Sequence, residues 1–429
     1  MKRVMTGSLG SYINNEVKIC GWIHRIRNLK KITFLIIRDR SGLVQCVFDN
    51  SLLQNINLRL EAVVSVQGIV KEGKNKFHDF EIQGENIEVI SEVNQELPIE
   101  INGENLDVNL DTMLNNRVLS LRHAKKNSIF RVQNVIVQAF REFLKDNDFT
   151  EIFTPKIVSE GAEGGTELFE VKYFENKAYL AQSPQFYKQM MVAAGFERVF
   201  EVGQVYRAEE HNTNRHLNEY VSMDFEMGFI DDEQDVMNLE EKLLKYIFTE
   251  VSAKCADQLN LLEAEVPDMS ISIPRIKLSE AIEILRSEYG KNDLQGDIDP
   301  EGEKFICKYV KEKYNSDFVF LTHYPRKKRP MYTMPEGEEE THSFDLLFRG
   351  MEITTGGQRI HTFDKLVENM RYKGLNPDNY INYTSVFKYG VPPHGGLAIG
   401  LERITSQLLG LTNVREASFI PRDRTRITP

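Results

Sequence analysis

Five short runs of β-branched and aromatic residues within the first 95 residues constrain the fold of this chain more than any other feature. Turn-forming residues such as Ser-Gly separate the runs, so each run is predicted to be one short strand. Five strands in so short a stretch predict a small barrel such as the oligonucleotide-binding (OB) fold. The runs cover residues 16–26, 31–40, 43–48, 62–73 and 79–90.

A basic segment lies within the first two of these runs. Residues 18–40 contain seven lysine and arginine residues and one acidic residue, although the whole chain has a net charge of −11. An acidic protein can hold a phosphate backbone through such a patch, because binding depends on how charge is distributed. A solvated strand face explains the pattern equally well. The basic residues are Lys18, Arg25, Arg27, Lys30, Lys31, Arg38 and Arg40.

The pattern changes after a polar stretch at residues 96–127, which reads as a linker between a barrel at 1–95 and a second domain at 128–429. Apolar residues spaced three and four apart predict two amphipathic helices, the first capped by Asn127 or Ser128. Strand-like runs outnumber helices, which favours an α+β fold with a largely antiparallel sheet flanked by helices. Residues 255–340 are expected to be an insertion in that sheet. The helical positions are Ile129, Val132, Ile136, Ala139 and Phe143, and Val236, Leu239, Leu243, Ile247 and Val251.

Targeting signals and cysteine motifs are not evident in the sequence. The first twenty residues contain no continuous apolar core, and no run approaches the roughly 18–20 apolar residues of a membrane helix. Four cysteines lie far apart without a CxxC pair, so neither a zinc site nor a disulfide framework is expected. We therefore expect a cytoplasmic protein with no membrane partner.

Residues 200–220 place charged side chains at the end of an apolar strand pattern. A strand-like run ends at Arg207, a polar loop follows, and a second run begins near Tyr220. A buried arginine is costly unless it meets an anion, and its planar guanidinium suits carboxylates and phosphates. A surface hairpin with ordinary ion pairs is the alternative. The loop adds Glu209, His211, Arg215 and His216.

A second segment, residues 344–361, combines carboxylates with glycines inside an apolar pattern. Asp345 and Glu352 offer the hard oxygen ligands that Mg²⁺ prefers. Gly356 and Gly357 would allow a ligand to approach the backbone closely. Arg359 ends the segment as a further candidate for a buried cation, although a glycine hairpin with flanking charges explains the same pattern.

A third segment, residues 392–410, leads from glycines through an apolar strand into a helix. The start of that helix carries Glu402 and Arg403. A helix N-terminus together with an arginine is a favourable place for a phosphate group.

Together these segments resemble the signature motifs of class II aminoacyl-tRNA synthetases. DFTEIFTP, which ends at Pro155, resembles motif 1, YRAEE and RHLNE resemble motif 2, and GLER resembles motif 3. Within that class, AQSPQFYKQ (181–189), TTGGQR (354–359) and PRDRTRITP are similar to aspartyl-tRNA synthetases of the archaeal and eukaryotic type. The resemblance covers nearly the whole chain, with the motifs in the family's order.

The resemblance implies a homodimeric ligase with an anticodon-binding OB barrel and a six- or seven-stranded antiparallel catalytic sheet. ATP and Mg²⁺ would activate L-aspartate, and the aspartyl group would pass to the 3′ end of tRNA(Asp). The catalytic residues would be Arg207, Glu352 and Arg403, and the metal ligands Glu352 and Thr355, where the family usually has Ser. The ATP site would contain Arg207, Ala208, Glu209, Arg215, His216, Leu217, Glu352, Gly400, Leu401, Glu402 and Arg403.

Substrate choice can be argued from charge, because an aspartate side chain needs cations around it. Lys188 and Arg359 match the family's side-chain recognition pair, and asparaginyl relatives usually lack this lysine. A pocket that pairs a carboxylate would leave a buried charge unpaired with an amide. The aspartate site implied by the resemblance consists of Glu163, Gln185, Lys188, Arg207, Thr355 and Arg359.

In the barrel, Phe34 and Gln45 match family positions that stack on and hydrogen-bond an anticodon base, although core packing is the alternative for Phe34. His24 lies two residues after Trp22. In the archaeal type, tryptophan at this position accompanies restriction to tRNA(Asp), and histidine accompanies charging of tRNA(Asn) as well. We therefore hypothesise relaxed tRNA choice, which would need an amidotransferase downstream.

Three alternatives remain open at this point. An asparaginyl-tRNA synthetase is disfavoured by Lys188. A small-molecule amide ligase of the asparagine synthetase type would lack the barrel. A non-catalytic RNA-binding paralogue would have lost Arg207, Glu352 or Arg403, and all three are present.

Overall fold

The computed structural model describes residues 1–162 and 167–428 and divides the chain into two compact units, Met1–Asn109 and Leu110–Pro429. Each unit has its own hydrophobic core. In the described residues, no helix is long and apolar enough to cross a membrane.

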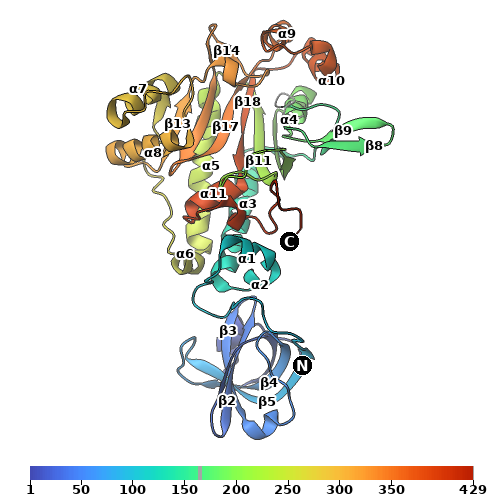
Figure 1. Cartoon of the computed structure of the whole chain (residues 1–429), viewed down its shortest axis with the longest axis vertical. Coiled ribbons are helices and arrows are strands. Elements are labelled where there is room, and N and C mark those ends of the chain that lie inside the picture. The colour runs from blue at the N-terminus through green and yellow to red at the C-terminus, as the bar shows by residue number, and fades with distance from the viewer. Residues whose placement is uncertain (163–166, 429) are drawn as a thin grey trace. The chain divides into compact units, whose positions relative to one another are not determined.

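The first unit is a closed five-stranded barrel with the strand order β1-β2-β3-β5-β4 (Figure 1). Neighbouring strands pair antiparallel except β3 and β5, which close the barrel in parallel. Alternate side chains along β1 fill the interior of the barrel. The elements are η1 (Thr6–Tyr12), β1 (Glu16–Asn28), β2 (Ile32–Asp39), β3 (Gly42–Asp49), η2 (Asn50–Leu53), β4 (Val63–Glu72) and β5 (Phe80–Ser91).

The second unit is built on a large mixed sheet, for which the described residues give the eight-strand order β12-β13-β16-β17-β18-β11-β10-β6 (Figure 1). The six strands from β13 to β10 pair antiparallel, and a short parallel strand adds to each edge. The strands are β6 (Thr150–Glu151), β10 (Arg198–Tyr206), β11 (Glu219–Gly228), β12 (Arg275–Lys277), β13 (Phe318–Thr322), β16 (Ser343–Phe348), β17 (Met351–Arg359) and β18 (His394–Gly400).

One face of this sheet is apolar and the other is polar. Along β11, Met223 and Phe225 enter the core beneath the long helices α3 (Ala124–Asp146) and α5 (Glu233–Lys254). The intervening Ser222, Asp224 and Glu226 point to the opposite face, because side chains alternate along a strand. That alternation places the polar groups of several strands on one surface.

Further elements surround the sheet. On its flank, α7 and α8 pack against β12 and β13 in a core of their own. These elements are α1 (Leu110–Asn115), α2 (Arg117–Ser120), β7 (Ile157–Val158), β8 (Glu170–Tyr173), β9 (Asn176–Leu180), α4 (Gln185–Met191), η3 (Val192–Phe196), α6 (Ala256–Leu262), α7 (Leu278–Tyr289), α8 (Pro300–Tyr314), η4 (Arg326–Lys328), β14 (Pro335–Glu336), β15 (Glu340–Thr341), α9 (Phe363–Tyr372), η5 (Pro377–Tyr380), α10 (Ile381–Thr384), η6 (Ser385–Tyr389), α11 (Leu401–Leu408) and η7 (Val414–Ala417).

The structure differs from the sequence-based expectation at three places. Residues 110–127, expected in a linker, form α1, α2 and the start of α3 within the second unit. The helix α3 begins at Ala124 after His123, so neither Asn127 nor Ser128 is its N-cap. Residues 255–340, expected as an insertion, supply β12 and β13 to the sheet itself.

Candidate active site

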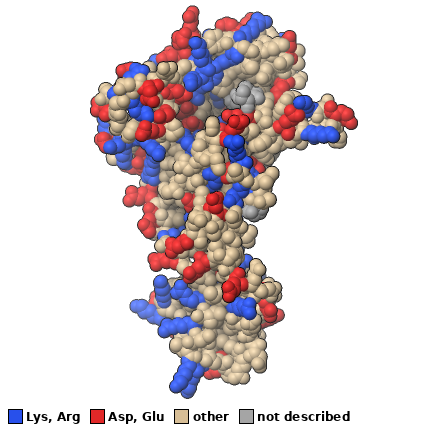
Figure 2. All heavy atoms as spheres, viewed as in Figure 1, with Lys and Arg blue, Asp and Glu red and all other residues tan. Residues whose placement is uncertain are grey.

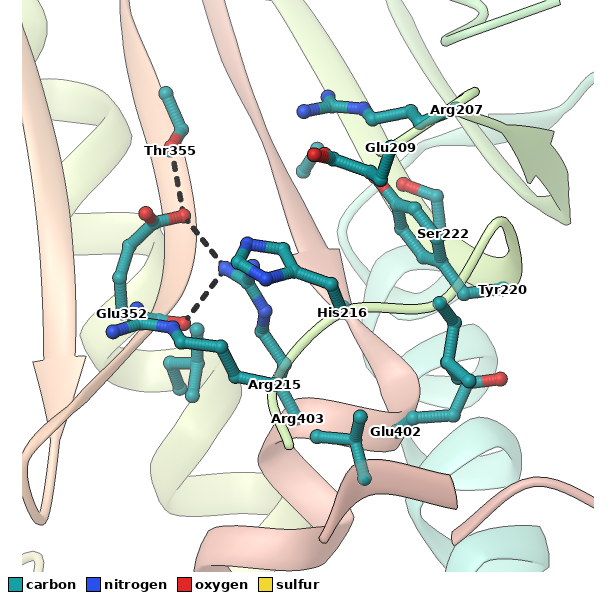
Figure 3. A pocket seen from close by; sticks show the side chains of 15 residues that line it. Arg207, Glu209, Arg215, His216, Tyr220, Ser222, Glu352, Thr355, Glu402 and Arg403 are labelled. Atoms are coloured by element: carbon teal, nitrogen blue, oxygen red, sulfur yellow. Dashed lines mark hydrogen bonds and ion pairs between the residues drawn. The ribbon is translucent and has the colours of Figure 1, made fainter. Parts of the chain in front are cut away.

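A pocket opens on the polar face of the sheet, where β11, β17 and β18 meet the start of α11. It brings together ten of the sequence-predicted residues (Figure 3). These are Arg207, Glu209, Arg215, His216, Leu217, Glu352, Thr355, Gly400, Glu402 and Arg403. The three segments that the sequence singled out therefore converge on one site.

Glu352 is the centre of one wall of this pocket. Arg403 donates from Nη1 to the Glu352 backbone oxygen and to Oε1, both at 3.1 Å, and Thr355 Oγ1 lies 3.3 Å from Oε1 (Figure 3). Burial acts to raise the pKa of Glu352, but Arg403, Arg215 and other arginines lower it overall. The carboxylate is therefore ionised at neutral pH.

Arg207 lies on the opposite side of the pocket, immediately after the end of β10 (Figure 3). Its guanidinium carbon lies 6.0 Å from the ring centre of Tyr220, at the start of β11. Burial lowers the pKa of His216 to about 4, and Arg403 adds to this effect, so the imidazole is neutral. The described lining of the pocket therefore includes three arginines, Arg207, Arg215 and Arg403, beside the ionised Glu352.

The loop between β10 and β11 carries Arg215 and is held by residues much later in the chain. Val414 N–H donates to Asn214 O at 2.9 Å, and Arg415 Nη1 donates to Thr213 O at 2.8 Å. Asn218 N–H donates to Arg422 O at 2.9 Å. The residues from 414 to 422 thus form one support of the site.

A buried cluster of positively and negatively charged side chains lies on the same face of the sheet, adjacent to the pocket. Lys188 Nζ, from α4, lies 3.0 Å from Asp224 and 3.3 Å from Glu226, and it donates to Leu397 O at 3.0 Å. Arg359 Nε donates to Glu226 at 2.9 Å, and Gln185 contacts the same carboxylate at 3.5 Å. Asp224 pairs with Ala398, which lines the pocket, so cluster and pocket are adjacent.

The structure adds residues that the sequence reading missed. Asp224 and Glu226 oppose the two cations, and Tyr220, Ser222, Ile353, Ala398 and Val414 line the pocket. Two carboxylates spaced by two within an otherwise apolar strand were the available signal for the first pair. Burial acts to raise the pKa of Glu226, but Arg359 and Lys188 lower it overall.

Several predicted residues lie elsewhere. Leu401 is buried in the core, and Ala208 donates its backbone N–H to Glu167 O at 2.9 Å. Glu402 does line the pocket, but its carboxylate accepts the Val221 N–H at 3.2 Å, and burial raises its pKa to about 8. Glu163 lies outside the described residues.

One expectation for the second segment needs correction. Gly356 was expected to make room for a ligand, but a Cβ there would lie 2.4 Å from the Phe344 ring, so internal packing explains this glycine. Asp345, the other carboxylate of this segment, lines a cavity with Glu352 and Thr355, and Arg329 Nη2 lies 2.8 Å from its Oδ1. At Gly396, in contrast, the backbone lies close to a buried carboxylate: a Cβ there would lie 2.3 Å from Glu226 Oε2.

The oxygen donors of this pocket could supply only part of the coordination shell of a Mg²⁺ ion. Within the described residues, no group of three or more His, Cys, Asp or Glu side chains could hold a metal. Glu352 and Thr355 supply one ionised carboxylate and one hydroxyl in the pocket. Mg²⁺ commonly takes one or two protein oxygens and completes its shell with phosphates and water.

A second cavity also uses Arg207 and is strongly basic. It is lined by Lys327, Lys328, Arg329 and Lys373, with Glu167 as its acidic residue. Lys327 and Lys328 are exposed. Phosphates are favoured in such surroundings.

In the barrel unit, the predicted residues lie on the outer surface of β1, β2 and β3. Phe34 is half-buried and does not belong to the barrel core, and Gln45 Nε2 donates to Glu81 at 2.7 Å. His24 Nδ1 lies 3.2 Å from Arg38 Nη1. Burial, and to a smaller extent the positive charge of Arg38, lowers the pKa of His24 to about 4. Figure 2 shows Lys and Arg side chains gathered on part of the visible barrel face.

Comparison with known proteins assigns both units. Residues 109–424 match the model of the class II tRNA synthetases (D, K and N), and residues 17–90 match the OB-fold nucleic acid binding domain. An aspartate–tRNA(Asp/Asn) ligase of Thermus thermophilus is 49% identical over the full length of both chains. An aspartate–tRNA(Asp) ligase of Pyrococcus abyssi is 44% identical over 96% of each.

Solved structures agree with this assignment. Asparaginyl-tRNA synthetase of Pyrococcus horikoshii, complexed with asparaginyl-adenylate, superposes with a TM-score of 0.93 at 28% identity over all of both chains. A putative aspartyl-tRNA synthetase of Leishmania major gives 0.89 at 32% identity, covering 100% of this chain and 95% of the other. The predicted α+β fold, an OB barrel with a class II sheet, is thereby confirmed. The chain belongs to the class II aminoacyl-tRNA synthetases of the D, K and N group.

Proposed function

We propose that the protein is an aspartate–tRNA ligase that activates L-aspartate with ATP and transfers it to tRNA. The observation that carries this proposal is the buried pair Lys188 and Arg359 beside a pocket rich in arginine. The relatives named aspartate–tRNA ligases, at 42–49% identity, support it. A cytoplasmic location goes with this function.

The buried cluster contains both cations and carboxylates, which suits an amino acid that itself carries carboxylates and an ammonium group. Aspartate would direct its side-chain carboxylate to Lys188 and Arg359 and its ammonium group to the acidic partners, helped by Gln185. Asparagine has no side-chain charge, so the two cations would gain nothing from it. The asparaginyl alternative is therefore not favoured.

The chemistry requires positioned charge more than a reactive side chain. The aspartate α-carboxylate attacks the α-phosphorus of ATP, the bond to the β-phosphate oxygen breaks, and pyrophosphate leaves. Arg207 binds the α-phosphate and the attacking carboxylate, whereas Arg215 and Arg403 bind the departing phosphates. The tRNA 3′-hydroxyl then takes the aspartyl group and AMP is released.

Glu352 and Thr355 are the residues that would hold Mg²⁺ in this scheme. The ion would neutralise phosphate charge when bound. The ionised Glu352 also holds Arg403 beside that position. Both functions need the same carboxylate.

The tRNA is proposed to contact both units. Phe34 and Gln45 would bind an anticodon base on the barrel, next to its exposed cations, and the basic cavity beside Arg207 suits the phosphates of the 3′ end.

We propose that tRNA(Asn) is charged as well as tRNA(Asp). His24 and relatives at 45–49% identity named aspartate–tRNA(Asp/Asn) ligases support this choice.

Aminoacylation with labelled aspartate on separate tRNA(Asp) and tRNA(Asn) transcripts tests the proposal. We expect both to be charged, and ATP–pyrophosphate exchange to depend on aspartate and not on asparagine. If only tRNA(Asp) is charged, the proposed relaxed choice of tRNA is contradicted, but the assignment as an aspartate–tRNA ligase stands. Exchange with asparagine instead of aspartate would overturn the aspartate assignment.

We also propose a homodimer, supported by exposed aromatic side chains at one end of the sheet. Phe229, after β11, is 70% exposed, and Tyr389, before β18, is 86% exposed. Phe196 precedes β10 at the same sheet end and is half exposed. Exposed aromatic groups in one region mark an association surface.

Sedimentation velocity at micromolar concentration should therefore give the mass of two chains. The double variant Phe229→Asp, Tyr389→Asp should sediment as a monomer, because charge at a buried interface opposes association. A wild-type monomer, or a double variant that still dimerises, would contradict the proposal.

A further inference from the structure

The helix α8 supplies a carboxylate that the class II motifs do not include and that contacts two residues of the ATP pocket, Arg215 and Glu352. Glu303 lies on its first turn and is only 7% exposed. It belongs to the segment 255–340, for which the sequence motifs indicate no functional role. Buried carboxylates need a reason, because removing one from water is costly unless it is paired.

The partner of Glu303 is Arg215, which lies 88 positions earlier in the chain. Arg215 Nη2 lies 2.9 Å from both Glu303 carboxylate oxygens. Each side chain is only about a tenth exposed, so the pair differs from the loose ion pairs at the surface. We propose that Glu303 is a positioning residue that holds Arg215 ready to bind a phosphate of ATP, which rests on the proposed function.

Glu303 also joins this arginine to Glu352 and, through it, to Arg403. The Glu352 backbone N–H donates to Glu303 Oε2 at 3.0 Å, and Arg403 contacts the Glu352 backbone oxygen and carboxylate. The loop carrying Arg215, the strand β17 and the helix α11 are thus connected through one carboxylate. Both Glu303 oxygens already accept hydrogen bonds, which makes this residue a poor metal ligand and a good anchor.

Fixing Arg215 matters because its loop has no regular structure. The two hydrogen bonds to Glu303 both come from Nη2, so the contact with Glu303 does not use the Nε–H and Nη1–H groups. An arginine already held in place loses less freedom when a phosphate binds. Figure 3 shows Arg215 beside Glu352 and Arg403 in the pocket.

The test compares Glu303→Ala and Glu303→Gln in aspartate-dependent ATP–pyrophosphate exchange, together with ATP binding by equilibrium dialysis. We expect Glu303→Ala to raise the KM and Kd for ATP about tenfold, with a smaller change in the KM for aspartate. Glu303→Gln keeps an acceptor oxygen and should lie between Ala and wild type. Glu301→Ala is the matched control, since Glu301 is exposed on the same helix turn.

A double-variant cycle separates positioning from folding. If Glu303 acts through Arg215, then Arg215→Ala with Glu303→Ala should bind ATP no more weakly than Arg215→Ala alone. Additive effects, or a Glu303→Ala variant that loses thermal stability at unchanged affinity for ATP, would overturn the inference. A wild-type protein without aspartate-dependent exchange would refute the proposed function alone, because the dialysis still measures the Glu303 effect.

Discussion

Replacing Glu352 with Gln is expected to lower aspartate-dependent ATP–pyrophosphate exchange by about 10²–10³-fold, the cost typical of removing one preorganised charge from a reaction centre. The substitution keeps the size of the side chain but removes the ionised partner of Arg403 and the proposed Mg²⁺ ligand. Arg403 would lose the group that holds it beside the pocket. Exchange rates at saturating ATP and aspartate measure the effect.

The same variant should fold normally, because about a third of the Glu352 side chain is exposed. Glu340→Gln is a suitable control, since Glu340 makes an exposed pair with Lys277 in the same unit. Because the pKa of Glu352 is lowered in the wild type, its carboxylate stays ionised through the ordinary glutamate range. A Glu352→Gln variant within about tenfold of the wild-type rate would contradict the assigned role.

Replacing Lys188 with Met is expected to abolish aspartate activation and to lower the free energy of unfolding by about 3–5 kcal/mol. Lys188 is 1% exposed and lies between Asp224 and Glu226, so its removal leaves buried negative charge. Chemical denaturation at neutral pH measures the loss of stability. Exchange assays with aspartate and asparagine measure the loss of activation.

A second substitution separates stability from recognition at this position. Lys188→Met with Asp224→Asn removes one charge of each sign and should recover part of the stability without recovering activation. The single variant should also be destabilised less at lower pH, because an unpaired buried carboxyl has a raised pKa and protonates there. Retained aspartate activation in either variant would remove Lys188 from the proposed substrate site.

The sequence predicted the strands well because each one alternates or is continuously apolar over a short span. It also singled out Arg207, Glu352 and Arg403, which line the pocket, since charge at a strand end, within an apolar strand or at a helix start is visible without knowing the fold. Asp224 and Glu226 were missed because their role depends on which strand lies beside β11. That neighbour, β18, is about 170 residues away in the chain.

Contacts between distant segments explain the other failures. Glu303 reads as one of several acidic residues at a helix start, and only the folded chain brings it to Arg215. The N-cap of α3 was misplaced because the helix begins at Ala124, five residues before Ile129, where its periodic apolar pattern starts. Gly356 was read as a ligand contact because Phe344, which needs the space, lies on the neighbouring strand.

The support of the β10–β11 loop by residues 414–422 has a consequence for synthesis on the ribosome. The chain is made from its N-terminus, so Arg215 emerges about 200 residues before the groups that hold its loop, among them Val414 and Arg415. Until those residues leave the exit tunnel, the nascent protein can form its barrel, much of its sheet and the Arg215–Glu303 pair, but the loop that carries Arg215 lacks its hydrogen bonds to Val414 and Arg415. The complete site is therefore formed only after residues 414–422 have emerged.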